Sequence, residues 1–227
     1  MIRNRLAALM GERGLKITRV AKDTGISRNS ITSISQNDSE MMRMETVNTL
    51  CKYLGVTPCE FFEYEPIDID FSVYINNLDY LITDQLTDAF TSVDFIQISI
   101  VDVDVIMDVN KNQQTESFDL HCSLIENVKF CLSDPGNFDY GIDLEIEFEN
   151  DAEKNDFVDE IYNKINSSFH QDVYQSLINK LNNEMREFLL QDIENNIHNT
   201  PYKQNLKKGI NSFFIIKKLQ SDVFKKF

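Results

Sequence analysis

The spacing of apolar residues changes at Pro66, and this change limits the folds that the chain can adopt. Before Pro66, apolar side chains recur every three or four residues, the period of a helix with one buried face. After Pro66 they alternate with polar side chains, the period of a strand that buries one face. The sequence therefore predicts two domains, an all-helical one at residues 1–65 and an α+β one at residues 66–227.

The first 65 residues predict five short helices. Ile2, Leu6 and Leu9 have helical spacing, and Gly11 and Gly14 mark the end of this first helix. The later helices are bounded by hydroxyl N-caps, by residues that tolerate the left-handed conformation and by a proline at a first helical position. These residues are Thr18, Gly25, Ser27, Asn37, Gly55, Thr57 and Pro58.

The second domain is predicted to begin with an antiparallel sheet. Residues 67–75 alternate strictly between apolar and polar side chains, and a helix is expected from about Leu78 to Phe90. Three further strands, at residues 93–110, 116–132 and 141–149, follow in an order that suggests a meander.

Long helices are expected after the sheet. Helical spacing returns at Asp151 and fits either two helices or one that is broken near Ser167 and Ser168. Pro201 is expected to end this helical region. The segment 210–219, INSFFIIKKL, fits a last strand or a helix equally well.

Charge is distributed unevenly along the chain, whose formal net charge is −15. Residues 66–202 hold six Lys or Arg against 28 Asp or Glu, whereas residues 1–52 hold nine against five. A net negative charge argues against a nucleic-acid binder, because DNA is a polyanion that attracts basic surfaces. Residues 1–52 are mildly basic, so the argument against DNA binding does not apply to them.

The tail, residues 203–227, holds seven Lys and one Asp. The tail either neutralises the acidic segment of the same molecule, here called the counterweight hypothesis, or binds phosphate as a second element. The counterweight hypothesis is favoured because the opposite charge lies in the same molecule.

Metal, cofactor and catalytic sites are not predicted. Acidic residues at alternating positions could bind a hard cation, but a solvated strand face explains them more simply. The three histidines share no catalytic motif with a nucleophile or carboxylate, so we expect structural roles and no enzyme. The four cysteines lie in apolar surroundings and are expected to be reduced core thiols. These residues are Asp68, Asp70, Asp102, Asp104 and Asp108; His121, His170 and His198; and Cys51, Cys59, Cys122 and Cys131.

No apolar run is long enough to cross a bilayer, and the first residues carry charge where a signal peptide needs an apolar stretch. The sequence therefore predicts a cytoplasmic protein without membrane contact.

The segment from Ile17 to Ile34, ITRVAKDTGISRNSITSI, resembles the Cro/C1-type (XRE) helix-turn-helix family. The following LCKYLGVTPCEFF is similar to the closing helices of that family. The resemblance implies a five-helix domain like that of lambda repressor, whose recognition helix enters the major groove of DNA. Two departures are Arg19, where the family often has Gln, and Gln36–Asp38, where it usually has a glycine.

The resemblance implies which side chains contact double-stranded DNA. The polar face of the recognition helix would read bases, with Arg28 and Asn29 the foremost readers and Ser30, Thr32 and Ser33 contacting bases or phosphate. Arg19, Lys22 and Ser27 would lie near the phosphate backbone, where cations and helix N-termini bind, although Arg19 also suits guanine.

Two functions are consistent with these features. The first is a transcriptional regulator, a phage-type or bacterial repressor, that binds operator DNA as a homodimer formed through its acidic domain. The second is an autoregulated effector, similar in plan to anti-CRISPR proteins or antitoxins, whose acidic domain binds and inhibits a protein partner. No Ala-Gly dipeptide of the kind cut in self-cleaving repressors is present.

Overall fold

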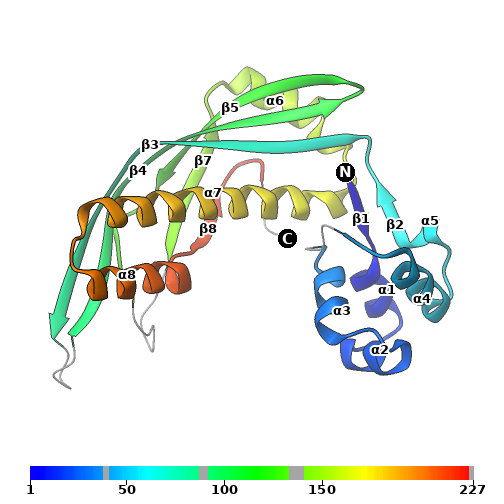
Figure 1. Ribbon diagram of the computed structural model, residues 1–227. Helices are drawn as coiled ribbons and strands as arrows, with labels where there is room; N and C mark the ends of the chain where they lie inside the picture. Colours follow the sequence, from blue (N-terminus) through cyan, green and yellow to red (C-terminus); the bar gives the residue numbers. More distant parts are fainter. Residues whose placement is uncertain (38–40, 87–91, 133–140, 225–227) are drawn as a thin grey trace. The chain divides into compact units, whose positions relative to one another are not determined.

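The computed structural model describes residues 1–37, 41–86, 92–132 and 141–224 (Figure 1). The chain divides into two compact units, Met1–Asp68, here called the head, and Ile69–Phe227, here called the sheet unit. The helices and strands form an N-terminal helical region followed by a mixed sheet with helices, an α+β architecture.

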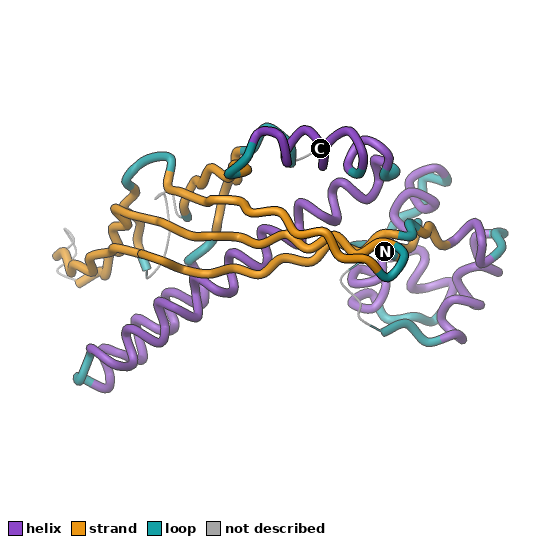
Figure 2. The backbone as a smooth tube through the Cα atoms, turned by 90° about the horizontal axis from the view of Figure 1, so that it is seen from above, coloured by secondary structure: helices purple, strands orange, loops and turns teal. Residues whose placement is uncertain are grey.

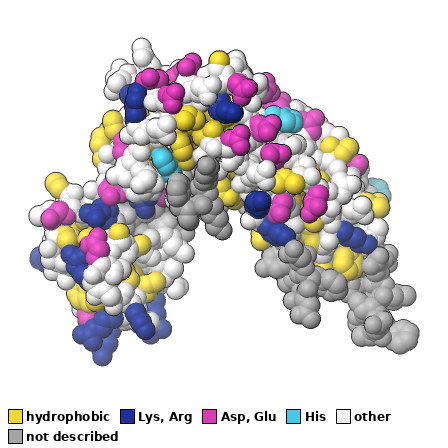
Figure 3. Space-filling view, turned by 180° about the vertical axis from the view of Figure 1, so that it is seen from behind, with side chains coloured by type: hydrophobic (Ala, Val, Ile, Leu, Met, Phe, Trp, Pro, Cys, Tyr) yellow, Lys and Arg dark blue, Asp and Glu magenta, His cyan; other side chains and the backbone are white. Residues whose placement is uncertain are grey.

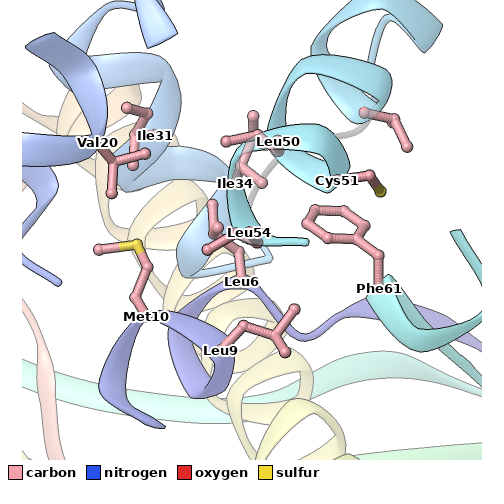
Figure 4. Close-up of a cluster of buried hydrophobic side chains, with 11 residues drawn as sticks. Leu6, Leu9, Met10, Val20, Ile31, Ile34, Leu50, Cys51, Leu54 and Phe61 are labelled. Carbon is pink, nitrogen blue, oxygen red and sulfur yellow. The ribbon is translucent and has the colours of Figure 1, made fainter. Parts of the chain in front are cut away.

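Helices form most of the head, with a short two-stranded ribbon joining its ends. The elements are β1 (Ile2–Asn4), α1 (Leu6–Glu12), α2 (Ile17–Thr24), α3 (Arg28–Ser35), α4 (Met44–Leu54), α5 (Pro58–Phe61) and β2 (Phe62–Tyr64). Strand β1 pairs antiparallel with β2. Apolar side chains from all five helices meet in one buried cluster, which includes Leu6, Val20, Ile31, Leu50 and Phe61 (Figure 4).

The N-terminal boundary differs from the sequence prediction. Ile2 belongs to β1 and is 72% exposed, so α1 begins only at Leu6. The apparent helical spacing of Ile2 was misleading, because backbone pairing with β2 holds this residue extended. Gly11 lies inside α1, and Thr18 lies inside α2, whose N-cap is Lys16.

Several predicted helix ends are confirmed. Gly25, Gly55 and Asn37 adopt the left-handed conformation after α2, α4 and α3, with φ of 74°, 66° and 56°. Ser27 caps α3, since its hydroxyl accepts from the Ser30 N–H at 3.1 Å. Pro58 occupies the first turn of α5.

The sheet unit is built on long strands. These are β3 (Ile67–Leu86), β4 (Ser92–Lys111), β5 (Gln114–Leu124), β6 (Val128–Cys131), β7 (Ile142–Phe148) and β8 (Ile216–Gln220). Their order is β3-β4-β5-β7-β8, with β6 also paired to β4. The predicted strand at 116–132 is therefore two strands, and β8 adds a parallel pairing with β7 that a meander lacks.

The predicted helix at 78–90 is wrong, because residues 78–86 continue β3; residues 87–91 lie outside the described part. At Asn76 and Asn77, the buried side chains of β3 change from odd-numbered to even-numbered positions. Ile69 and Phe71 are buried before this point, whereas Leu78 is buried after it. The switch interrupts the alternation, and it gives Leu78, Leu81 and Ile82 a spacing that resembles a helix.

One long helix covers a face of the sheet. The helical elements are α6 (Asp151–Glu160), a 3₁₀ turn (Tyr162–Lys164), α7 (Ser167–Asn196) and α8 (Thr200–Phe213). Figures 1 and 2 show the 30-residue α7 lying along the sheet and crossing its strands. Pro201 lies in the first turn of α8, where its missing N–H costs nothing, and does not end the helical region.

Asparagines define where these helices begin. Asn150, Asn166 and Asn199 precede α6, α7 and α8, and each side chain accepts a hydrogen bond from an N–H in the first turn. The undecided segment 210–219 contains both structures, since α8 ends at Phe213 and β8 begins at Ile216.

Aromatic side chains fill one end of the sheet core. Phe224, near the C-terminus, is 1% exposed and its ring lies 5.9–6.3 Å from the rings of Phe71, Phe148, Phe157 and Tyr162. Such edge-to-face, tilted and stacked ring pairs stabilise a core beyond the area that they bury. Phe224 of the tail is therefore part of the core.

The cysteines are all free, but they are not all buried. Cys51, Cys122 and Cys131 are core residues, whereas Cys59 is exposed on α5, so the prediction of four core thiols is wrong for Cys59. Burial raises the pKa of Cys122 to about 12 and also raises that of Cys51.

We expect a thiol reagent at neutral pH to modify only Cys59 in the folded protein, because the other three thiols are buried and the reagent does not reach them. Mass spectrometry after brief labelling checks this. Equal labelling of Cys122 without denaturant would contradict the fold of β5.

No helix in the described part of the chain is long and apolar enough to cross a membrane.

Candidate nucleic-acid interface

A tight turn joins α2 to α3. Gly25 ends α2, and its N–H donates to the Ala21 carbonyl at 3.0 Å. The Thr24 hydroxyl accepts from the Ile26 N–H at 3.3 Å and donates to the Val20 carbonyl at 2.7 Å. Three residues separate α2 from α3, whose apolar side chains lie in the head core. This arrangement is a helix-turn-helix.

The first turn of α3 presents two uncommitted side chains. Arg28 and Asn29 are exposed, and neither side chain forms a hydrogen bond or ion pair with the described residues. Ile31 and Ile34 lie on the opposite side and are buried. A guanidinium and an amide at the N-terminal end of an exposed helix can both donate to base edges.

The hydroxyls of α3 are partly committed within the helix. The Ser27 and Ser30 hydroxyl oxygens lie 2.8 Å apart, and the Thr32 hydroxyl donates to the Arg28 carbonyl at 2.9 Å. Thr32 and Ser33 are half-buried. Thr32 can therefore accept a further hydrogen bond through its oxygen while its own proton stays with Arg28.

A three-residue clamp holds Arg19 on α2. Its Nε donates to Asp23 Oδ2 at 2.6 Å, and the same carboxylate oxygen accepts from the Tyr53 hydroxyl of α4 at 2.9 Å. Arg19 remains 65% exposed, and its two terminal nitrogens have no partner among the described residues. Asp23 thus orients the guanidinium and links α2 to α4, while Lys22 lies exposed beside it.

The clamp changes the pKa values of its members. The Tyr53 hydrogen bond is the largest cause that lowers the pKa of Asp23, followed by Arg19. Asp23 in turn raises the pKa values of Arg19 and Tyr53.

We expect an NMR titration to place the pKa of Asp23 below its ordinary value of 3.8. Tyr53→Phe and Arg19→Gln should each move the pKa of Asp23 back toward that value. Because the folded pKa is lowered, the stability that Asp23 contributes is complete above pH 3.8 and is lost as the pH falls through the lowered value. An Asp23 pKa at or above 3.8 would rule out the clamp in solution.

Two asparagines anchor the C-terminal end of α3 to β1. Asn4 is 5% exposed, and its side-chain amide donates to the Ile34 carbonyl at 2.7 Å and to Asn37 Oδ1 at 2.6 Å. The Asn4 N–H donates to the same oxygen at 2.8 Å. Asn37 belongs to the stretch Gln36–Asp38, which the sequence comparison with the family marked as a departure, and this departure was the signal that could have drawn attention to the contact. Sequence reasoning missed Asn4.

Basic side chains gather at one end of the head in Figure 3. Some cations are neutralised, since Arg3 and Arg5 pair with Glu63 and Arg13 pairs with Glu12. Others are exposed and form no ion pair within the described residues: Lys16, Lys22, Arg28, Arg43 and Lys52. Arg43, at the N-cap of α4, was not selected from the sequence.

Acidic side chains lie on the open face of the sheet, where β4 and β5 are paired. Asp102, Asp104 and His121 offer ligand atoms within 4.8 Å of one another. Asn76 already donates to both carboxylates, at 3.2 and 2.8 Å, and together with His121 it lowers the pKa of Asp104. All three are about half exposed, and hydrogen bonds within the group account for its geometry.

The helix-turn-helix frame and the exposed polar start of α3 define the head as a DNA-binding domain. Residues 5–66 match the family of Cro/C1-type HTH DNA-binding domains, so the N-terminal part of the chain is a domain of this type. The match covers less than a third of the chain. Neither the search of curated proteins nor that of solved structures gave a match.

Proposed function

We propose that this protein is a transcriptional repressor, of a phage or bacterial type, that binds operator DNA sequence-specifically as a homodimer. The observation that carries the proposal is the uncommitted pair Arg28 and Asn29 at the start of α3, on a Cro/C1-type frame. Small modules of this kind read few base pairs, so two half-sites are needed for strong discrimination.

Each candidate residue has a chemical role in this proposal. Arg28 donates both terminal nitrogens to guanine O6 and N7, and Asn29 forms a pair of hydrogen bonds with adenine. The hydroxyls of Ser30, Thr32 and Ser33 contact bases or phosphate. Arg19, Lys22 and Ser27 bind the backbone, because phosphate favours cations and helix N-termini.

The clamp suits Arg19 to a backbone contact. With Nε held by Asp23, the terminal nitrogens point outward in a restricted set of directions, so less side-chain freedom is lost when they meet a phosphate. Repression then follows from occupancy, since a dimer seated on a promoter excludes RNA polymerase.

The acidic region has a complementary role in the proposal. Residues 66–202 hold 28 Asp or Glu against six Lys or Arg, a charge that DNA repels. DNA contact is thereby confined to the heads, while the second domain supplies the dimer and regulation. Lys203 and Lys207 of the tail pair with Glu194 of this acidic region, and these pairs lower the pKa of Glu194. This contact favours the counterweight hypothesis for the tail.

The second candidate, an effector that binds a protein partner, rests on the acidic open face of the sheet. On this face Asp104, His121 and Glu147 are neighbours across three strands, and Asp102, Ser123 and Glu145 form the next row. A basic protein surface would complement this face.

A reporter gene under the DNA upstream of this gene tests the proposed function. We expect wild-type protein to lower reporter output and Arg28→Ala/Asn29→Ala protein, at equal abundance, to leave it unchanged. Unchanged output with wild-type protein, together with no DNA enriched from a random pool, would leave only the effector hypothesis.

A further inference from the structure

Strand β3 is the end strand of the sheet, and its outer edge has no strand partner in the described part of the chain. It is 20 residues long, whereas strands commonly have about 3–10. An unpaired edge offers backbone N–H and C=O groups to another chain, and proteins usually protect such edges with Pro, Lys or a bulge. β3 contains no Pro, Lys or Gly.

The two halves of this edge differ in their surroundings. In the second half, Leu78, Tyr80 and Ile82 line a groove of about 400 Å³ together with Phe188 and Asp192 of α7. The Tyr80 hydroxyl donates to Asp192 at 2.5 Å, so α7 lies beside this half. At the start of the strand, the Met1 amino group pairs with Asp68 at 2.7 Å. The segment Ile69–Ile75 lies between these contacts.

The segment Ile69–Ile75 is complementary to itself when two copies run antiparallel with Ser72 opposite Ser72. Phe71 then faces Val73 and Ile69 faces Ile75, so apolar side chains meet on the buried face of the sheet. On the open face Asp70 faces Tyr74. Tyr74 is 54% exposed and its hydroxyl has no partner among the described residues, so it can donate to that carboxylate. A register centred on Asp70 would instead oppose two aspartates, which is unfavourable.

We propose that Ile69–Ile75 of β3 pairs with the same segment of a second copy about a two-fold axis at Ser72, and that this pairing forms the dimer. The inference rests on the proposed DNA-binding function, because that function requires two copies of the chain. Each chain enters its head at Ile67, which in this register lies opposite Asn77. The two entry points are therefore about ten residues, or roughly 33 Å, apart along the strands.

Cysteine cross-linking tests the register directly in full-length protein that carries Cys59→Ser. Residues directly opposite in antiparallel strands have Cα atoms about 4.5–5.5 Å apart, within the range of a disulfide. Under mild oxidation Ser72→Cys should give a covalent dimer. The matched variant Asn76→Cys, which is about eight residues from its copy in this register, should stay monomeric on a non-reducing gel.

A charge variant tests the same pairing by mass. Sedimentation of the wild type should give about twice the 26.4 kDa of the chain. Tyr74→Asp, at an exposed position, should raise the dimer dissociation constant about tenfold or more, because Asp then faces Asp70. Adding Asp70→Lys should restore the dimer through opposite charges.

A monomeric wild type at about 100 μM, or cross-linking at Asn76→Cys in place of Ser72→Cys, would overturn this proposal. These readouts do not use DNA. A cross-linked Ser72→Cys dimer that binds no DNA would therefore contradict the proposed function alone.

Discussion

The double variant Arg28→Ala/Asn29→Ala is expected to bind the operator about 100-fold more weakly than the wild type. Each bidentate contact between a side chain and a base contributes roughly 1–3 kcal/mol of discrimination. Both side chains are exposed and form no hydrogen bond or ion pair with the described residues. Binding to unrelated DNA should weaken only a few-fold, because it depends on the number of cations and the double variant loses one of them. Fluorescence anisotropy on both DNAs measures the difference.

The control Asn48→Ala/Lys52→Ala removes the same two chemical groups, an amide and a cation, from exposed positions on α4. It should weaken binding to both DNAs by the same small factor. Equal losses in the two double variants would mean that α3 does not read bases.

Phe224→Ala is expected to lower the free energy of unfolding of the sheet unit by about 3–5 kcal/mol, the usual cost of deleting a buried aromatic ring. Phe224 contacts rings from β3, β7 and α6, so the remaining cavity cannot close without moving three elements. Urea unfolding followed by tyrosine fluorescence measures the loss, because the chain has no Trp.

Phe188→Ala provides a matched comparison, since this ring on α7 is 37% exposed. Its loss should cost about 1 kcal/mol or less. If the two variants were equally stable, Phe224 would not be part of the core.

Most of the head could be predicted because local signals agree with its tertiary structure. Gly25, Ser27 and Gly55 act through their own backbone and the adjacent turn, so their roles can be read from a short segment. β1 could not be found this way, because its conformation depends on pairing with β2, about sixty residues away.

The sheet unit was less predictable because its long strands change buried face. An alternation pattern assumes a constant parity, and β3 breaks it at Asn76 and Asn77. The parallel strand β8 was undecided for a related reason. Its partner β7 is more than seventy residues away, and the five residues of β8 have no clear period of their own.

In the candidate site, features set within one helix could be predicted, whereas contacts between distant elements could not. The exposure of Arg28 and Asn29 follows from the positions of Ile31 and Ile34 on the opposite side of one helix. The clamp on Arg19 needs Tyr53 from α4, thirty residues from Asp23, and the support of α3 needs Asn4 from β1. These positioning contacts join elements that are distant in sequence.

The specificity ratio of the wild-type protein is the most direct measurement of the central claim. Its affinity for the sequence that it enriches from random DNA would be compared with that for a scrambled duplex of the same composition, at physiological salt. We predict a ratio of about 1,000 or more, in the range of sequence-specific regulators. Equal affinities that fall together as salt rises would contradict sequence-specific binding by the head.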